Sequence, residues 1–200
     1  MKLFEGYDAI AAGGGGTLAL KSDKTLWFWG WDGQGTLGDG VDEKITTPKQ
    51  VGTNVVAIAA GYGHYLALRD NGDLFAWGYN DYGQVGDGSF STRLDPVQIG
   101  FNFIAVSAGY AHSMAIKADG SLWTWGWNAS GQLGTGTTTN EIAPVKIGTG
   151  FNMIAAGGSH SMAVKSVGTL WTWGENQGGQ LGDGSTTDSW EPKQISFPVE

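Results

Sequence analysis

Short apolar stretches recur along the chain, and glycine-containing turns separate them. In residues 122–125 two tryptophans lie two positions apart, so on a strand both indoles point to one face, while Leu122 and Thr124 point to the other. Aromatic and β-branched side chains are typical of strands. Four stretches of strand length follow one another at residues 103–107, 113–117, 122–127 and 145–148. The pattern predicts one four-stranded antiparallel sheet in this segment.

This unit repeats along the whole chain with a period of 48 residues. The step is seen in the glycine that follows the third stretch, which recurs without a gap as Gly30, Gly78, Gly126 and Gly174. We predict one domain over residues 1–200. Its repeats are expected at residues 1–48, 49–96, 97–144 and 145–192, with a closing strand at residues 193–200.

A repeat of about 40 to 50 residues made of short strands is typical of β-propeller blades, because one such repeat cannot bury both of its faces alone. Each copy supplies the strands of one blade. The expected fold class is therefore all-β, with four four-stranded antiparallel blades of 48 residues each. The sequence leaves two arrangements open, which are a closed ring of four blades and an open arc that is completed by oligomerisation.

A glycine-rich loop follows the third stretch of the first repeat and contains Gly33, Gly35 and Gly38 in the spacing G-x-G-x-x-G. In a dinucleotide-binding fold such a loop opens a helix whose N-terminus faces the phosphates. The segment that follows, residues 41–48, is short, is rich in β-branched side chains and ends with a proline, so no helix is expected there. Similar loops follow in the other repeats. Because a residue type that every repeat needs is normally architectural, we interpret the loop as a structural turn.

Composition agrees with an all-β chain and narrows the range of partners. The 200 residues include 35 glycines, ten tryptophans, eight phenylalanines and six tyrosines, which are turn formers and bulky strand residues. The formal net charge of −8 disfavours nucleic acid and anionic membranes as partners. The absence of cysteine excludes disulfides and thiolate metal sites. We recognise no signal peptide and no apolar run near the roughly 18 residues of a membrane span, so a soluble chain is expected and its localisation is not predicted.

The repeat also resembles a known family. Residues 125–136 follow the pattern Trp-Gly-x-Asn-x-x-Gly-Gln-Leu-Gly-x-Gly, and Ala-Gly-x-x-His-Ser precedes it at residues 108–113 and returns at residues 156–161. These motifs are similar to the repeats of the regulator of chromosome condensation family. The resemblance covers essentially the whole chain and implies a β-propeller, typically of seven blades. This sequence departs from the family in having only four repeats, and we interpret it as a four-repeat member of bacterial or phage type. Its first repeat is degenerate, with Gly16, Asp32 and Thr36 in place of His, Asn and Gln.

Residues that the repeats share are assigned structural roles. The three histidines occupy one repeat position, but no carboxylate accompanies them at the spacing of a metal site. We expect each imidazole to hydrogen-bond backbone near the inner turn of its blade. A structural role is also expected of one tryptophan in each repeat, and the full set is His64, His112, His160, Trp29, Trp77, Trp125 and Trp173. No metal, cofactor or catalytic triad is predicted, and we do not expect an enzyme.

Function in a repeat fold is expected where the repeats differ. The segments that precede the repeated prolines differ completely and carry typical binding anchors, which are Phe90, Arg93 and Trp190. The position after the Trp-Gly pair holds Glu175 in the last repeat, and a buried glutamate would be costly, so this position is expected to be at least partly exposed. In the other repeats it adds three aromatic candidates for partner binding, Trp31, Tyr79 and Trp127.

The leading functional hypothesis is a non-enzymatic scaffold that binds a protein partner through variable rim loops. Two alternatives stay open. One is a structural, self-assembling component of a larger particle such as a phage virion, and the other is an enzyme inhibitor or exchange-factor-like regulator, which the family resemblance implies. We also expect a homo-oligomer, because an open arc of four blades would leave two apolar blade faces in water.

Overall fold

The computed structural model describes residues 6–30 and 44–196. In these residues it contains strands and turns, and the strands form four sheets of four, termed blades. Blade 1 comprises β1 (Tyr7–Ala12), β2 (Gly16–Lys21), β3 (Leu26–Gly30) and β4 (Ile45–Gly52). Blade 2 comprises β5 (Val55–Ala60), β6 (His64–Arg69), β7 (Leu74–Gly78) and β8 (Arg93–Gly100). Blade 3 comprises β9 (Phe103–Ala108), β10 (His112–Lys117), β11 (Leu122–Gly126) and β12 (Glu141–Gly148), and blade 4 comprises β13 (Phe151–Ala156), β14 (His160–Lys165), β15 (Leu170–Gly174) and β16 (Ser189–Ile195).

Within every blade the strands pair antiparallel in chain order. The prediction of an all-β fold with four four-stranded antiparallel blades is confirmed. The fourth strand of blade 3 begins at Glu141, earlier than the expected residue 145, because Gly126 pairs with Glu141 across an irregularity in the register. This strand includes Pro144 and lies at the edge of its sheet, where a proline is tolerated. In the described residues there is no helix of the length and apolar character that a membrane span requires.

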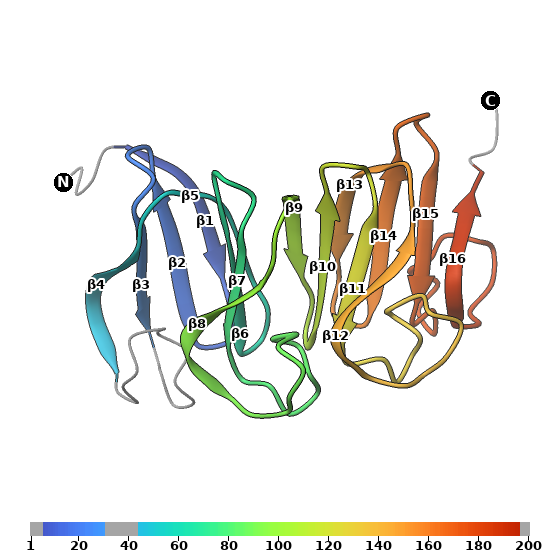
Figure 1. Ribbon diagram of the computed structural model, residues 1–200. Coiled ribbons are helices and arrows are strands. Elements are labelled where there is room, and N and C mark those ends of the chain that lie inside the picture. The colour runs from blue at the N-terminus through green and yellow to red at the C-terminus, as the bar shows by residue number, and fades with distance from the viewer. Residues whose placement is uncertain (1–5, 31–43, 197–200) are drawn as a thin grey trace.

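The four blades stand in a row as an open arc, with blades 1 and 4 at opposite ends (Figure 1). Their innermost strands, β1, β5, β9 and β13, pack one against the next. Backbone hydrogen bonds join the inner turns of neighbouring blades, since Gly14 N donates to Tyr62 O at 2.8 Å and Tyr62 N donates to Tyr110 O at 3.0 Å. Of the two arrangements that the sequence leaves open, the structure adopts the arc.

Three hydrophobic clusters fill the spaces between consecutive blades. The cluster between blades 2 and 3 includes Leu66, Leu68, Leu74, Phe103, Ala115 and Trp125. Each junction contains one completely buried tryptophan from its second blade, and these are Trp77, Trp125 and Trp173. Trp29, the counterpart in blade 1, is only partly buried. In blades 2 to 4 the repeated tryptophan therefore packs its blade against the blade before it.

The glycine-rich loops of blades 2 to 4 are ordered by one asparagine each. In blade 3 the side-chain amide of Asn128 donates to Thr137 O and to Thr139 O, both at 2.9 Å. Its Oδ1 atom accepts from Leu133 N at 2.9 Å. The same bonds recur around Asn80 and Asn176. These loops are therefore structural turns, while the copy at residues 33–38 lies outside the described residues.

One glycine at the start of this loop cannot be replaced without strain. Gly126 has a φ angle of 100°, a conformation that other residues rarely adopt. A Cβ atom at this position would lie 2.6 Å from Ala111 O. Backbone shape thus explains why a glycine follows the last tryptophan of the third strand in every repeat.

The histidines of blades 2 and 3 hydrogen-bond across the junctions. His64 Nε2 lies 2.9 Å from Ser113 Oγ, and His112 Nε2 lies 3.0 Å from Ser161 Oγ. The partner is a side chain of the next blade and not backbone of the same blade, because the buried imidazole reaches over the junction. Burial lowers the pKa of His64 to about 4 and that of His112 to about 3. Among the described residues, no three His, Asp or Glu side chains are grouped to hold a metal ion.

Candidate protein-interaction rim

One edge of the arc gathers the segments in which the repeats differ. Because His112 pairs with Gly126, the turn before β10 and the loop after β11 leave blade 3 at the same edge. Blades 2 and 4 have the same register. This edge, termed the lower rim, lies at the bottom of Figure 1 and is formed by residues 61–63, 79–92, 109–111, 127–140, 157–159 and 175–188.

Five aromatic side chains of blades 2 and 3 meet on the lower rim. The rings of Tyr62 and Tyr110 stack with their centroids 4.7 Å apart. Trp127 lies 6.2 Å from Tyr110 and 6.0 Å from Tyr82, measured between ring centroids. Tyr82 in turn lies 6.3 Å from Tyr79. These five residues form one continuous group, termed the aromatic cluster.

The aromatic cluster is open to solvent on one side. The exposed fraction of Tyr62 is 58% and that of Tyr110 is 48%. Tyr79 and Trp127, which directly follow the third strands of blades 2 and 3, are partly buried. Exposed aromatic rings that their neighbours already hold in place provide a large contact area. Protein-binding hot spots are typically rich in such aromatic residues.

Carboxylates accompany the aromatic cluster. The hydroxyl of Tyr79 donates to Asp81 Oδ2 at 2.6 Å, and this bond is the main reason that the pKa of Tyr79 rises to about 12. Glu175 takes the position of Tyr79 and Trp127 in blade 4, and it is partly exposed. The lower-rim segments contain no lysine or arginine. The rim therefore combines aromatic surface with negative charge.

Two of the partner-binding candidates from the sequence, Tyr79 and Trp127, belong to the aromatic cluster, and Trp31 lies outside the described residues. Sequence reasoning misses the other three members, which are Tyr62, Tyr82 and Tyr110. A signal for two of them exists in the repeat alignment, since Tyr62 and Tyr110 share one position, two residues before a histidine. Their stacking depends on the distance between the inner turns of neighbouring blades, and an alignment of the repeats gives no such distance.

The three loop candidates have different surroundings. Phe90 is 55% exposed in the loop of blade 2. The guanidinium of Arg93 donates from Nε to Asp87 Oδ2, and the side chain of Asp87 is almost completely buried. Trp190 packs against the loop of blade 3, where a Cβ on Gly131 would lie 2.5 Å from the indole Cδ1. Phe90 is thus free for a partner, whereas Arg93 and Trp190 also hold loops in place.

Replacing Arg93 by alanine is expected to lower the free energy of unfolding by about 1–3 kcal/mol, because the buried Asp87 carboxylate loses its charged partner. Urea unfolding of the purified chain measures this loss. Phe90→Ala is the control and is expected to change the free energy by less than about 0.5 kcal/mol. Equal losses in the two variants would contradict this division of roles.

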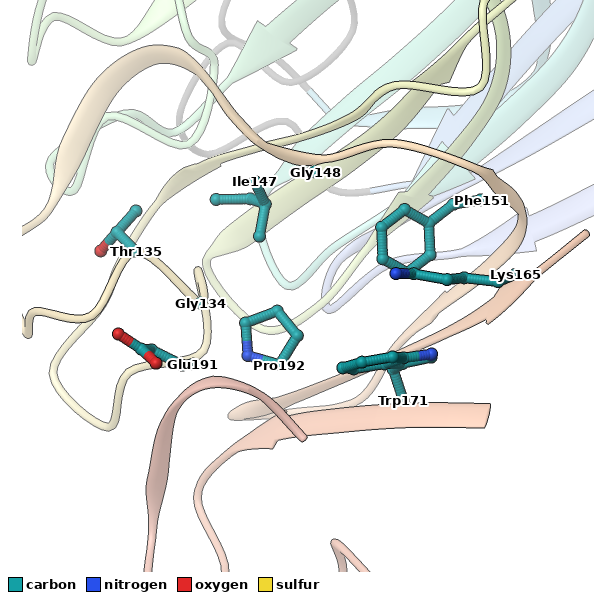
Figure 2. Close-up of a pocket in the computed structure, with 9 residues that line it drawn as sticks. All are labelled: Gly134, Thr135, Ile147, Gly148, Phe151, Lys165, Trp171, Glu191 and Pro192. Carbon is teal, nitrogen blue, oxygen red and sulfur yellow. The ribbon is translucent and has the colours of Figure 1, made fainter. Parts of the chain in front are cut away.

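The opposite edge of the arc, termed the upper rim, carries a cation that stacks on a ring in each blade. The pairs are Lys21 over Trp27 at 4.7 Å, Arg69 over Phe75 at 4.2 Å, Lys117 over Trp123 at 4.8 Å and Lys165 over Trp171 at 4.3 Å. A pocket of about 330 Å³ between blades 3 and 4 places Lys165 between Trp171 and Phe151 (Figure 2). Because every blade contains the same cation and ring pair, we interpret it as part of the repeat.

The comparisons with known proteins agree with this architecture. The sequence matches the family model of the RCC1-like domain over residues 2–200. Human WBSCR16 has a similar structure, with a TM-score of 0.88 and 26% identity over 99% of this chain and 55% of that chain. Prp20p from Saccharomyces cerevisiae, described with its binding to Gsp1p and histones, has a TM-score of 0.84 and 26% identity over 96% of this chain and 50% of that chain. No curated protein matches the sequence.

A second structure of the yeast protein, called RCC1 (Prp20) and bound to Kap60, has a TM-score of 0.83 and 26% identity over 96% of this chain and 49% of that chain. The chain therefore spans about half the length of the solved chains that it matches. The family model, in contrast, covers nearly all of this chain. Together with the four blades and their repeated motifs, that match means that the chain belongs to the RCC1-like domain family.

Proposed function

We propose that the chain is a non-enzymatic scaffold that binds a protein segment on its lower rim. The observation that carries this proposal is the aromatic cluster, which lies on the edge where the repeats differ and is open to solvent. The repeated asparagines and buried histidines are already engaged in loops and junctions. Prp20p, which belongs to a similar fold, is described as binding Gsp1p, histones and Kap60, and this supports a protein-binding role.

The chemistry of the lower rim favours a partner segment with arginine or lysine side chains. Asp81 and Glu175 supply carboxylates. Among the described residues, the two cations that reach the lower rim are each paired there with a carboxylate, namely Arg93 with Asp87 and Lys193 with Asp183. A cation over an aromatic ring gains about 0.5–2 kcal/mol. The net charge of −8 would also attract a basic segment from a distance. Rings and charge thus favour the same class of partner.

Two synthetic peptides of equal length test this chemistry directly, one alternating arginine with serine and the other alternating glutamate with serine. Fluorescence anisotropy with a labelled peptide measures the affinity for the purified chain. We expect the arginine peptide to bind at least tenfold more tightly and its affinity to fall as salt is added. Equal affinity for the two peptides would contradict a basic partner.

Replacing Tyr110 and Trp127 together by alanine is expected to weaken binding of the arginine peptide by about tenfold, since two ring contacts of about 0.5–1 kcal/mol each are lost. The control is Phe101→Ala, which removes an aromatic side chain that is 62% exposed and lies outside the lower rim. Circular dichroism and melting temperature verify that both proteins are folded. The same loss of affinity in both would place the binding site elsewhere.

A further inference from the structure

The two ends of the arc expose blade faces that are buried elsewhere. Met153 on β13 is 62% exposed, and Ile10 on β1 is 77% exposed. The counterpart of Ile10 in blade 2, Ile58, packs into the cluster between blades 1 and 2. On β14 and β15 the apolar residues Met162, Val164 and Leu170 are partly buried, while their counterparts in the inner blades are buried, namely Leu66, Leu68, Leu74, Met114, Ile116 and Leu122. Each end of the arc is thus one half of a blade junction.

The junction between blades 3 and 4 shows how two such halves fit. Ser161 Oγ donates its single hydroxyl hydrogen to Gln132 O at 2.7 Å. In the 3.0 Å contact with His112, Ser161 Oγ is therefore the acceptor and the Nε2–H of His112 is the donor. Trp173 Nε1 donates to the same Gln132 O at 2.9 Å. One blade therefore supplies an imidazole and a loop carbonyl, and the next supplies a hydroxyl and an indole. The junction between blades 2 and 3 repeats these bonds with His64, Gln84, Ser113 and Trp125.

The junction between blades 1 and 2 is built differently. Gly16 stands where blades 2 to 4 have histidine, and Tyr65 stands where blades 3 and 4 have serine. A Cβ on Gly16 would collide with the Phe28 ring and would lie 2.6 Å from the Tyr65 hydroxyl oxygen, so the glycine makes room for both rings. The ring of Tyr65 also meets Phe28 edge to face, with centroids 5.3 Å apart. Here a glycine and tyrosine pair replaces the histidine and hydroxyl pair.

The two free ends carry the unused halves of a histidine and hydroxyl junction. Blade 4 presents His160 and the backbone carbonyl of Gln180 at the repeat positions of the imidazole and the loop carbonyl. Blade 1 presents Thr17 and Trp29 at the positions of the hydroxyl and the indole. Within residues 6–30 and 44–196, no side-chain hydrogen bond is formed by His160, Thr17 or Trp29, and all three are partly exposed. Blade 1 thus lacks a histidine for its own next blade but retains the hydroxyl that blade 4 requires.

We propose that a second copy of this chain covers both ends, with blade 4 of each copy packed against blade 1 of the other. The proposed contact continues the two established histidine junctions, with His160 donating to Thr17 and with Thr17 and Trp29 donating to Gln180 O. It also covers Met153 and Ile10. The inner turns match as well, because Tyr110 N donates to Gly158 O at 3.1 Å, and Gly158 N and Gly14 O are left for the same bond between copies.

Two copies joined in this way make a closed ring of eight blades. Propellers of four to eight blades are known, and eight require a turn of about 45° per blade, close to the roughly 51° of a seven-bladed ring. Both contacts in such a ring are identical and head to tail, so the ring leaves no apolar blade face in water. The proposal is independent of what binds on the lower rim.

Sedimentation or light scattering of the 200-residue chain measures the assembly. We expect a mass of about 42 kDa, twice the 21.0 kDa of one chain. Met153→Glu and Ile10→Glu each place a charge on one end of the arc. Both side chains are exposed in a single arc, so the fold of the single chain tolerates the change. Each variant alone is expected to run as a monomer. Phe90→Glu is the control on the lower rim and is expected to keep the dimer mass.

Mixing the two end variants distinguishes head-to-tail contact from symmetric contact. The mixture contains one intact blade 4 face, on Ile10→Glu, and one intact blade 1 face, on Met153→Glu, so we expect a dimer to form only on mixing. A dimer of either variant alone would show that like ends pair, and this would overturn the proposal. A stable monomer of the unchanged chain, or an open polymer, would overturn it as well.

Discussion

Replacing Trp125 by alanine is expected to lower the free energy of unfolding by about 3–5 kcal/mol. The indole is completely buried between blades 2 and 3 and donates from Nε1 to Gln84 O at 2.9 Å. Alanine would leave a cavity among Leu66, Leu74 and the other members of this cluster and would remove the hydrogen bond. The loss is large because the tryptophan is the largest side chain in the junction.

Urea unfolding followed by circular dichroism measures this loss at a fixed protein concentration. Trp190→Ala is a matched control, since this tryptophan is 51% exposed, and its loss is expected to be about 1–2 kcal/mol. Trp125→Phe keeps most of the volume and should lie between the two. A loss in Trp125→Ala no larger than that in Trp190→Ala would contradict the junction role of Trp125.

Lowering the pH from 7 to 5 is expected to remove about 4 kcal/mol from the free energy of unfolding, through two histidines. Burial lowers the pKa of His64 to about 4 and that of His112 to about 3, from an ordinary value of 6.5. The unfolded chain takes up protons below pH 6.5, while the folded chain does so only near the lowered values. Above pH 6.5 both histidines are mostly neutral in the folded and the unfolded chain, so the free energy of unfolding keeps its full value. As the pH falls to 5, protons bind preferentially to the unfolded chain, and the free energy of unfolding declines by about 2 kcal/mol per histidine.

The same unfolding experiment at pH 7 and pH 5 tests this dependence. His112→Gln should reduce the difference between the two pH values by about half. The carboxyl groups whose pKa is lowered, such as Asp23 and Asp119 through hydrogen bonds from Thr25 and Ser121, ionise below this window. An unchanged pH dependence in His112→Gln would show that the buried imidazole is not the source.

The blades could be predicted because each repeat contains the strand and turn pattern of one complete sheet. Alternation around residues 122–125 indicates a strand, and the return of this pattern after 48 residues indicates equivalent sheets. The junction bonds could not be predicted in the same way. His64 and Ser113 are 49 residues apart, and their pairing depends on the angle between two blades. For this reason the expected backbone partner of the histidines is wrong, although their burial follows from the repeat.

The lower rim could be predicted in part. The departure of the repeat at Glu175 indicates an exposed position, which places Tyr79 and Trp127 correctly at a solvent-accessible edge. Tyr62 and Tyr110 could not be identified in this way, because they lie in short turns that have the length of simple connections. Their rings stack only when two blades pack together. A residue in a variable loop can also be structural, as the contact of Arg93 with Asp87 demonstrates.

Hydrogen–deuterium exchange of the chain, with and without saturating arginine peptide, maps the binding surface without any substitution. We expect the peptide to slow exchange at the turns and loops of the aromatic cluster, which are residues 61–63, 79–83, 109–111 and 127–131. The upper-rim turns at residues 70–72 and 118–120 should exchange at the same rate in both samples. Slower exchange confined to the upper rim, or to the pocket around Lys165, would contradict a binding role for the aromatic cluster.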